Sequence, residues 1–347
     1  MFKRIFETFS NNIAIDLGTS NTLVYMQGNL ILDEPSIVAL VVGKSGGEKK
    51  ILAIGKEARE MLGKTPKEIE VVRPMKDGVI ADFHITEQMI KLFIKKASKF
   101  KRMTSIRTNI VISVPYGSTQ VERRAIKNTA LAVGAHHVEI IEKVMAAAIG
   151  AGLPIASPHA SIVVDIGGGT TEVGVISLGG LVYAGSIRVA GDRMDEVIAN
   201  YIRSKYGLLI GSLTAERIKM TIGSAHSSTD NNSMEIHGRN LFDGLHKKMT
   251  INSAEICDAL GETLNQITTT VKQALEATPP ELSEVLLNSG IFLTGGVSLL
   301  SGLDILLSEV TQLKVTVAEE PLRCVAKGCV MAMNYVATNK IYISKEN

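Results

Sequence analysis

The chain has 347 residues, of which 45% are apolar and 21% are charged, a composition typical of folded globular proteins and not of disordered ones. Its length exceeds what one hydrophobic core usually serves, so we expect at least two domains. A formal net charge of +2, no Trp and only 4% aromatic residues give no basis for a nucleic-acid partner. Three cysteines, Cys257, Cys324 and Cys329, lack disulfide-like or metal-ligand spacing, which predicts reduced, structural thiols in the cytoplasm.

The N-terminal segment MFKRIFETFSNN predicts a short amphipathic helix that ends at Ser10. No apolar signal-peptide core follows it. Four large apolar residues, with Lys3 and Arg4 beside them, suit an anionic membrane surface, although docking on the protein itself is the alternative. These four residues are Phe2, Ile5, Phe6 and Phe9. A second membrane candidate is the segment KFKRMTSIR, which contains Phe100, Met103 and Ile106 among four basic residues.

The next segment, NIAIDLGTSNTLVYM, predicts two apolar strands that turn through Gly18, with an acid and hydroxyls at the bend. Residues 33–74 mix strand-like runs with one helical pattern and are predicted to form a small insertion. The amphipathic run ITEQMIKLFIKKASKF, the apolar run TNIVISVP and the run STQVERRAIKNTALAVGA then predict helix, strand and helix. This alternation is typical of an α/β architecture.

Residues 144–164 carry no charge and meet the crude length criterion of ~18–20 residues for a membrane span. Gly150, Gly152, Pro154 and Pro158 interrupt the stretch, so we predict a short Ala-rich helix, a loop and a strand instead. That strand opens ASIVVDIGGGTTEVGVIS, which repeats the layout of the first hairpin: apolar run, Asp, Gly, Thr and a second apolar run. Two such hairpins far apart predict a duplicated, two-lobed fold with one site between the lobes.

The two bends have the chemistry of phosphate loops. Backbone N–H groups around Gly and Thr can cradle phosphate oxygens, and Asp16 and Asp165 could hold Mg²⁺ through water. Near the C-terminus, IFLTGGVSLLSGL predicts a strand, a Gly-Gly turn and a helix start that could receive an adenosine or a phosphate. Either hairpin alone is equally compatible with a plain structural turn, whereas the pair favours nucleotide binding.

These segments resemble the five motifs of the actin/sugar kinase/Hsp70 ATPase superfamily. IDLGTSNT is similar to the first phosphate loop, VVDIGGGTTEV to the second, FLTGGVSLL to the adenosine motif, and VMAAAIGAGLP and PLRCVAKGC to the two connecting helices. The phrases RPMKDGVIADF, VPYGSTQVERRAI, AERIK and ALEATPPEL resemble the MreB family of bacterial actins over nearly the whole chain.

The resemblance implies an actin-like two-lobed ATPase fold, with duplicated ribonuclease-H-like domains and a nucleotide cleft between them. The implied parts are an N-terminal helix (1–10), subdomain IA (11–32, 75–153 and 318–347), subdomain IB (33–74), subdomain IIA (154–210 and 251–317) and subdomain IIB (211–250). It also implies an ATP and Mg²⁺ site. The implied nucleotide-binding residues are Thr19, Ser20, Asn21, Gly167, Gly168, Gly169, Thr170, Glu216, Arg217, Lys219, Gly295, Gly296, Val297 and Ser298. Without the resemblance, Glu216 and Lys219 would read as a surface ion pair worth only ~0.2–0.5 kcal/mol.

The chain departs from the family at two positions. MreB proteins usually carry Glu-Pro at the start of the first connecting helix, where the Glu positions the attacking water; here Lys143 and Val144 occupy those positions. A Lys is no base at neutral pH unless its pKa is strongly depressed, so we expect slow or absent hydrolysis. The alternative is an alignment shifted by one residue, with Glu142 in the catalytic role of an ordinary ATPase. Val297 replaces the third Gly of the adenosine motif.

The resemblance therefore implies a divergent MreB-like protein that binds ATP, forms homopolymeric filaments and takes part in cell shape. It would lie in the cytoplasm at the inner face of the cell membrane, where other MreB-type or cell-shape proteins could join it. A sugar kinase would need a second substrate site and a larger chain, and an Hsp70-like chaperone would need a peptide-binding domain after the ATPase. A nucleotide-binding structural filament that hardly hydrolyses ATP is the reading that Lys143 favours.

Overall fold

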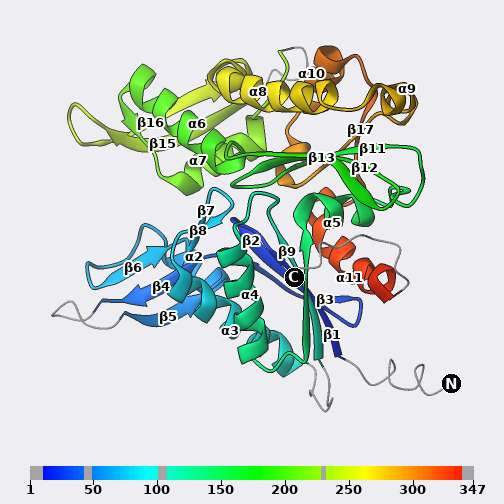
Figure 1. Cartoon of the computed structure of the whole chain (residues 1–347). Coiled ribbons are helices and arrows are strands. Elements are labelled where there is room, and N and C mark those ends of the chain that lie inside the picture. The colour runs from blue at the N-terminus through cyan, green and yellow to red at the C-terminus, as the bar shows by residue number, and fades with distance from the viewer. Residues whose placement is uncertain (1–10, 43–48, 101–107, 228–231, 338–347) are drawn as a thin grey trace. The chain divides into compact units, whose positions relative to one another are not determined.

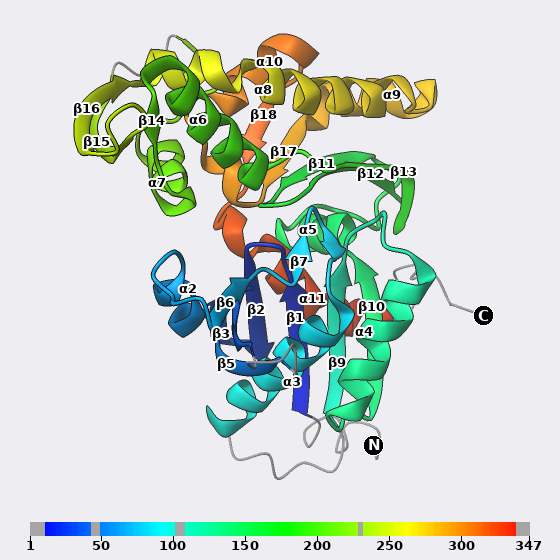
Figure 2. The same cartoon turned by 90° about the vertical axis from the view of Figure 1, so that its left-hand side faces the viewer.

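A computed structural model describes residues 11–42, 49–100, 108–227 and 232–337. The chain divides into two compact units, drawn in Figures 1 and 2. Unit 1 takes Met1–Pro158, Ser177–Leu181 and Arg323–Asn347, and unit 2 takes His159–Ile176 and Val182–Leu322. The predicted N-terminal helix and the segment 101–107 lie outside the described residues. Within the described part of the chain, no helix is both long and apolar enough to cross a membrane.

Unit 1 is built on a five-stranded sheet. Across the sheet the strands are β10 (His137–Glu142), β9 (Thr108–Val114), β1 (Asn11–Leu17), β2 (Asn21–Met26) and β3 (Asn29–Pro35). Strand β1 runs antiparallel to β2 and parallel to β9, which is parallel to β10. The predicted first hairpin is therefore confirmed as β1 and β2, and the run TNIVISVP forms the buried strand β9.

Helices cover the two faces of this sheet (Figure 2). On one face lie α3 (Phe83–Phe100) and α4 (Gln120–Ala132), whose apolar residues share a core with Ile13, Ile15 and Leu17 of β1. The other helices are α5 (Lys143–Gly150) and α11 (Cys324–Ala337). A capping box between Thr119 and Glu122 begins α4, because each residue's side chain accepts the other's backbone N–H.

Helices α5 and α11 cross at very close range, and two glycines permit it. A Cβ on Gly150 would lie 1.8 Å from the Cys324 carbonyl oxygen, and a Cβ on Gly328 would lie 1.7 Å from that of Ala146. Both distances are shorter than any non-bonded contact, so only residues without a side chain fit at this crossing. Cys324 and Cys329 are buried in α11, and none of the three cysteines, all of which lie in the described ranges, forms a disulfide.

After β3 ends at Pro35, residues 38–72 contribute a small sheet and a helix to unit 1. The sheet has the order β5 (Lys50–Ile54), β4 (Val38–Val41) and β6 (Ile69–Val72), and its helix is α2 (Lys56–Met61). A two-stranded hairpin follows, β7 (Met75–Lys76) and β8 (Val79–Ile80), whose turn residues Asp77 and Gly78 both have positive φ. Asp-Gly is the dipeptide that such a two-residue turn favours.

Unit 2 repeats the sheet of unit 1. Its strands, in order across the sheet, are β13 (Gly180–Ile187), β12 (Thr171–Ser177), β11 (Ser161–Ile166), β17 (Ile291–Thr294) and β18 (Val315–Val317). Strand β11 runs antiparallel to β12 and parallel to β17, which is parallel to β18. Strands β11, β12, β13, β17 and β18 thus correspond to β1, β2, β3, β9 and β10. The predicted duplication holds for the whole sheet, not only for the hairpins.

The remaining elements of unit 2 enclose one large core. Its helices are α6 (Gly191–Tyr206), α7 (Ser212–Ile222), α8 (Ser253–Glu276), α9 (Pro280–Ser289) and α10 (Leu303–Thr311), with short turns η1 (Gly296–Leu299) and η2 (Pro321–Arg323). A further sheet has the order β14 (Leu208–Leu209), β15 (Ser233–Asn240) and β16 (His246–Asn252). After the Gly-Gly turn of the adenosine motif the chain forms η1 first, and α10 begins only at Leu303, because Gly302 stands before it in a left-handed conformation.

Candidate functional site

The first predicted loop connects β1 to β2 in unit 1. Asp16, one residue from the end of β1, is 7% exposed and accepts a 2.7 Å hydrogen bond from the Ser113 hydroxyl on the neighbouring strand β9. The bend closes where the Gly18 N–H donates to the Asn21 carbonyl at 3.1 Å. This arrangement fixes a buried carboxylate beside a short loop whose backbone turns sharply.

The second predicted loop has the same construction in unit 2. Asp165 is 2% exposed and accepts a 2.8 Å hydrogen bond from the Thr294 hydroxyl on β17. The Gly167 N–H donates to the Thr170 carbonyl at 2.9 Å. In both sheets the Asp and its hydroxyl partner are directly paired across parallel strands, Asp16 with Ser113 and Asp165 with Thr294.

Sequence reasoning missed Ser113 and Thr294. Each is a hydroxyl residue near the end of an otherwise apolar run, TNIVISVP or IFLTGG. A buried hydroxyl needs a hydrogen-bond partner. A hydroxyl residue at the end of an apolar strand therefore indicates a polar partner nearby, and this was the available signal in the sequence. Only the strand pairing shows that the partner in each case is the loop Asp.

The three hydroxyl and amide residues of the first loop are held to different degrees. Thr19 is buried, and its Oγ1 accepts from the Gly78 N–H of the Asp-Gly turn at 3.2 Å. Ser20 is half-buried, and Asn21 is exposed and donates from its amide to Asp33 at 3.3 Å. A further hydrogen bond holds the loop, because the Ser36 hydroxyl donates to the Gly18 carbonyl at 2.6 Å.

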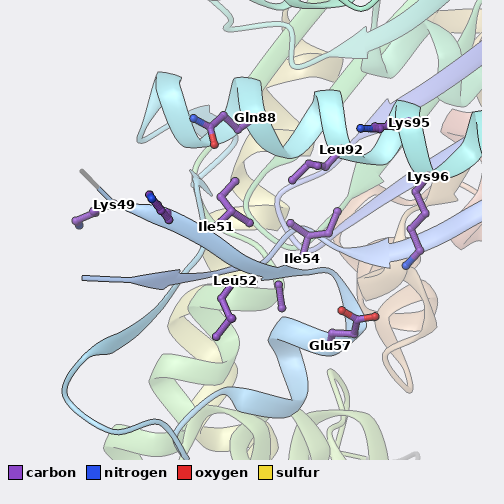
Figure 3. Close-up of a pocket in the computed structure, with 11 residues that line it drawn as sticks. Lys49, Ile51, Leu52, Ile54, Glu57, Gln88, Leu92, Lys95 and Lys96 are labelled. Carbon is purple, nitrogen blue, oxygen red and sulfur yellow. The ribbon is translucent and has the colours of Figure 1, made fainter. Parts of the chain in front are cut away.

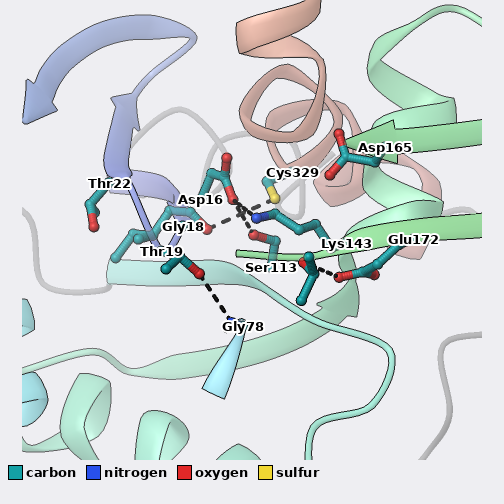
Figure 4. A network of polar contacts seen from close by, with 12 residues as sticks. Asp16, Gly18, Thr19, Thr22, Gly78, Ser113, Lys143, Asp165, Glu172 and Cys329 are labelled. Atoms are coloured by element: carbon teal, nitrogen blue, oxygen red, sulfur yellow. Dashed lines mark hydrogen bonds and ion pairs between the residues drawn. The ribbon is translucent and has the colours of Figure 1, made fainter. Parts of the chain in front are cut away.

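Lys143 and Glu142 point to different partners. Lys143 begins α5 and is 8% exposed, and its Nζ lies 3.7 Å from Asp16 Oδ1 (Figure 4). Glu142 ends β10, and its Oε1 accepts a 3.0 Å hydrogen bond from Arg123 Nη1 on α4. The Lys143 ammonium therefore faces the first loop, while the carboxylate of Glu142 is engaged in an ion pair elsewhere in unit 1.

Burial and charge around Asp16 also affect a thiol. The pKa of Cys329 is raised because the thiol is completely buried, with the nearby Asp16 carboxylate adding to the effect. The thiol is therefore protonated at neutral pH and packs as an apolar group.

In unit 2 the adenosine motif and the second loop meet at Gly191, the first residue of α6. A Cβ at Gly191 would lie 3.1 Å from Lys219 Nζ, 3.2 Å from Val297 Cγ2 and 3.3 Å from the Gly167 carbonyl oxygen. Gly191 also donates its N–H to the Gly167 carbonyl at 3.1 Å, and Asp192 donates its N–H to that of Gly168 at 2.8 Å. The structure thus brings together residues from three separate predicted motifs.

Gly295, the first Gly of the Gly-Gly turn, has φ of 81°. A Cβ there would lie 2.3 Å from the Ile166 carbonyl oxygen, so this position requires glycine on both counts. Gly296 is exposed, while Val297 is buried, as is Ser298, whose hydroxyl donates to the Gly295 carbonyl at 2.6 Å.

The predicted residues of AERIK lie on α7. Lys219 Nζ lies 2.9 Å from Asp195 Oδ1 on α6, and Glu216 is half-buried, whereas Arg217 is exposed. Asp195 was not a sequence candidate. Burial raises the pKa of Asp195 to about 6, and the neighbouring Lys219 ammonium opposes the rise.

A second carboxylate that the sequence did not single out is Glu172 on β12. It is completely buried, and its Oε1 accepts a 3.3 Å hydrogen bond from the Thr170 hydroxyl beside the second loop. Burying a carboxylate without a hydrogen-bond partner costs free energy. The hydrogen bond from Thr170 therefore ties Glu172 to the second loop.

The predicted carboxylates fit Mg²⁺ only together with waters and phosphate oxygens. Among the described residues, no group of three or more His, Cys, Asp or Glu side chains converges as a metal site. Each loop offers a single carboxylate, and Mg²⁺ commonly uses one or two carboxylates together with waters and phosphate oxygens. Each of these carboxylates, Asp16 in unit 1 and Asp165 in unit 2, therefore suits by itself a cation that arrives with a nucleotide and keeps most of its water.

A groove of about 640 Å³ in unit 1 lies apart from these residues (Figure 3). It runs along β5 and faces α3, with Ile51, Ile54 and Leu92 among its apolar residues and Lys95 at its edge. None of the predicted nucleotide-binding residues lines it.

Comparison with known proteins agrees with these motifs. The model of the MreB/Mbl protein family matches residues 10–341. The cell shape-determining protein MreB of Escherichia coli is 51% identical over 331 residues, which cover 94% of each chain. The crystal structure of MreB 5 of Spiroplasma citri bound to AMPPNP is 37% identical with a TM-score of 0.88, covering 95% of this chain and 98% of that chain.

The double helical filament of MamK, at 21% identity and a TM-score of 0.78 over 94% of this chain and 99% of that chain, shares the fold. The fold is therefore actin-like, as expected. A family model that matches nearly the whole chain and a relative of 51% identity lead to one conclusion. The chain belongs to the MreB/Mbl protein family.

Proposed function

We propose that this protein binds ATP with Mg²⁺ and assembles into cytoskeletal filaments that act in cell shape. The observation that carries the nucleotide proposal is the repeated unit of Asp, hydroxyl and Gly bend, built at equivalent positions of two sheets. The related MreB 5 was crystallised with AMPPNP, an ATP analogue, which supports the same ligand class here.

Each loop has a distinct part in this proposal. Backbone N–H groups of residues 18–21 and 167–170 would contact phosphate oxygens, as short Gly-containing loops do. The side chains of Lys219 and Glu216 would meet the ribose and purine edge, and residues 295–298 would line the nucleoside. Asp16 and Asp165 would hold Mg²⁺ through water, and the cation would neutralise phosphate charge.

The Gly168→Val variant tests the site. It places a branched side chain on the second loop, and we expect ATP binding, measured by fluorescence of a labelled ATP, to be lost. The matched control is Gly261→Ala in α8, where a new Cβ would have no neighbour within 4 Å. Unchanged ATP affinity in a folded Gly168→Val protein would contradict the proposed site.

We further propose that ATP hydrolysis is slow or absent. Support comes from the side-chain directions: the Lys143 ammonium faces Asp16, and Glu142 is paired with Arg123. An ammonium cannot accept a proton from water, so it would stabilise bound phosphate charge without activating the nucleophile. An ordinary ATPase that uses Glu142 would first have to break the Glu142–Arg123 pair.

Membrane attachment at the inner face of the cell membrane is the last part of the proposal. It rests on the sequence of residues 1–10, which lie outside the described structure, and on the gain in avidity that a filament gives to many weak anchors. Pelleting with anionic liposomes should weaken when residues 1–9 are deleted. Equal pelleting of both proteins would exclude a role for this segment.

A further inference from the structure

The side chain of Lys219 is held from two sides in unit 2. Its Nζ donates a 2.9 Å hydrogen bond to the Gly191 carbonyl and lies 2.9 Å from Asp195 Oδ1. Gly191 and Asp195 are four residues apart on α6, which places them on one face of the helix. The side chains of Lys219 and Asp195 are each 14% exposed, so the ion pair is largely removed from water.

This arrangement connects Lys219 directly to the second loop. The same Gly191 that accepts from Lys219 donates its N–H to the Gly167 carbonyl. A free lysine side chain loses rotamer entropy when it is ordered. An ion pair formed before the ligand arrives would remove part of that cost from binding.

We propose that Asp195 is a positioning residue, which holds the Lys219 ammonium against the start of α6 and next to the second loop, ready to contact a bound nucleotide. This inference rests on the proposed nucleotide site and adds to it a residue that makes no contact with nucleotide itself. Asp195 acts only through Lys219, so its effect must vanish when Lys219 is removed.

The charge of Asp195 gives the pair a dependence on pH. The charged groups around Asp195 are Lys219 and Glu216 on α7 and Asp192 on its own helix. Burial raises the pKa of Asp195 to about 6 despite the Lys219 ammonium. The carboxylate is therefore charged at pH 7.5 and mostly neutral at pH 5, where it would hold Lys219 less firmly.

A double-mutant cycle with labelled ATP tests the proposal on the full-length protein. We expect Asp195→Asn to weaken ATP binding about tenfold, the scale of one lost charge-assisted contact. Lys219→Met should weaken binding at least as much. The double variant should bind no more weakly than Lys219→Met alone.

The matched control is Glu196→Gln, which removes the charge of an exposed neighbour on α6 that pairs with Arg193. It should leave ATP affinity unchanged. A second readout needs no change at Asp195: the ratio of wild-type to Lys219→Met affinity should fall as pH is lowered from 7.5 to 5. This ratio cancels the titration of ATP itself and tests the proposal even if Asp195→Asn fails to fold.

The outcomes separate the two proposals. A wild-type protein that does not bind ATP contradicts the proposed function. If the wild-type protein binds ATP, the positioning role is overturned by an Asp195→Asn variant with unchanged affinity for ATP. It is also overturned if Asp195→Asn weakens ATP binding as much in the Lys219→Met background as in wild type. A wild-type to Lys219→Met ratio that stays constant between pH 7.5 and 5 overturns it as well.

Discussion

Replacing Lys143 with glutamate should convert this protein into a faster ATPase. The variant restores a carboxylate at the first residue of α5, where the present ammonium lies 3.7 Å from Asp16 Oδ1. General-base assistance is typically worth ~10²–10⁴-fold. We therefore expect phosphate release at saturating Mg²⁺ and ATP to rise by about that factor in Lys143→Glu.

The same substitution should cost stability in the absence of nucleotide. Two unit charges about 4 Å apart interact by roughly 4 kcal/mol at an effective dielectric constant of 20. Lys143 and Asp16 side chains are 10% and 9% exposed, so solvent screens this pair little. Lys143→Glu replaces that attraction with repulsion, and we expect a lower melting temperature that Mg²⁺ and ATP partly restore.

Two controls make the comparison specific. Lys143→Gln removes the positive charge without adding a carboxylate, so it should not raise phosphate release. Glu142→Ala breaks the ion pair with Arg123, whose two side chains are 12% and 15% exposed, and should lower the melting temperature without affecting turnover. A Lys143→Glu protein that binds ATP but releases phosphate no faster than wild type would contradict this role of Lys143. The role is equally refuted if Glu142→Ala abolishes a substantial wild-type activity.

Three further predictions concern stability. Gly328→Ala forces a Cβ to within 1.7 Å of the Ala146 carbonyl oxygen and should lower the free energy of unfolding by about 1–3 kcal/mol. Gly261→Ala places its Cβ where no atom lies within 4 Å and should raise the free energy of unfolding by about 0.5–1 kcal/mol. Urea titrations measure both changes. Asn252→Ala removes the side chain that caps α8 by accepting from the Glu255 N–H and should cost about 1 kcal/mol; no loss would contradict the cap. The folded-state pKa of Asp195 is above its usual value, so Asp195 stabilises the fold most below pH 3.8 and loses that contribution as pH rises through about 6. The melting temperature of wild type relative to Asp195→Asn should therefore increase as pH falls from 7 to 5, and a constant difference would argue against the shift.

Much of the fold could be predicted because its signals are local. The apolar runs of β1, β9 and β11, the helical periodicity of α3 and α4, and the repeated Asp-Gly-Thr pattern all lie within short stretches of sequence. The segment HVEIIE, which forms β10, was not predicted, and neither was the hairpin of β15 and β16. Strands β15 and β16 have few apolar residues, and β10 carries Val and Ile between charged residues, so neither shows a continuous apolar run.

The loop motifs are evident in the sequence, whereas the residues that support the loops are not. Ser113 and Thr294 donate to the loop carboxylates, and Asp195 pairs with Lys219. Each is a single polar residue, and its partner lies 97, 129 or 24 positions away, respectively. No sequence pattern indicates such distant pairings. The i,i+3 spacing in AERIK indicates Glu216 as a neighbour of Lys219, whereas only the packing of α7 against α6 brings Asp195 to Lys219.

Sedimentation of the purified protein, with and without Mg²⁺ and ATP, tests the central claim most directly. We expect ATP or its non-hydrolysable analogue AMPPNP to convert monomers into pelletable filaments, and Gly168→Val to stay monomeric under the same conditions. Filaments formed equally well by wild type with ATP and with AMPPNP would agree with slow hydrolysis. A wild-type protein that remains a single monomeric species across nucleotide, salt and protein concentration would contradict the account.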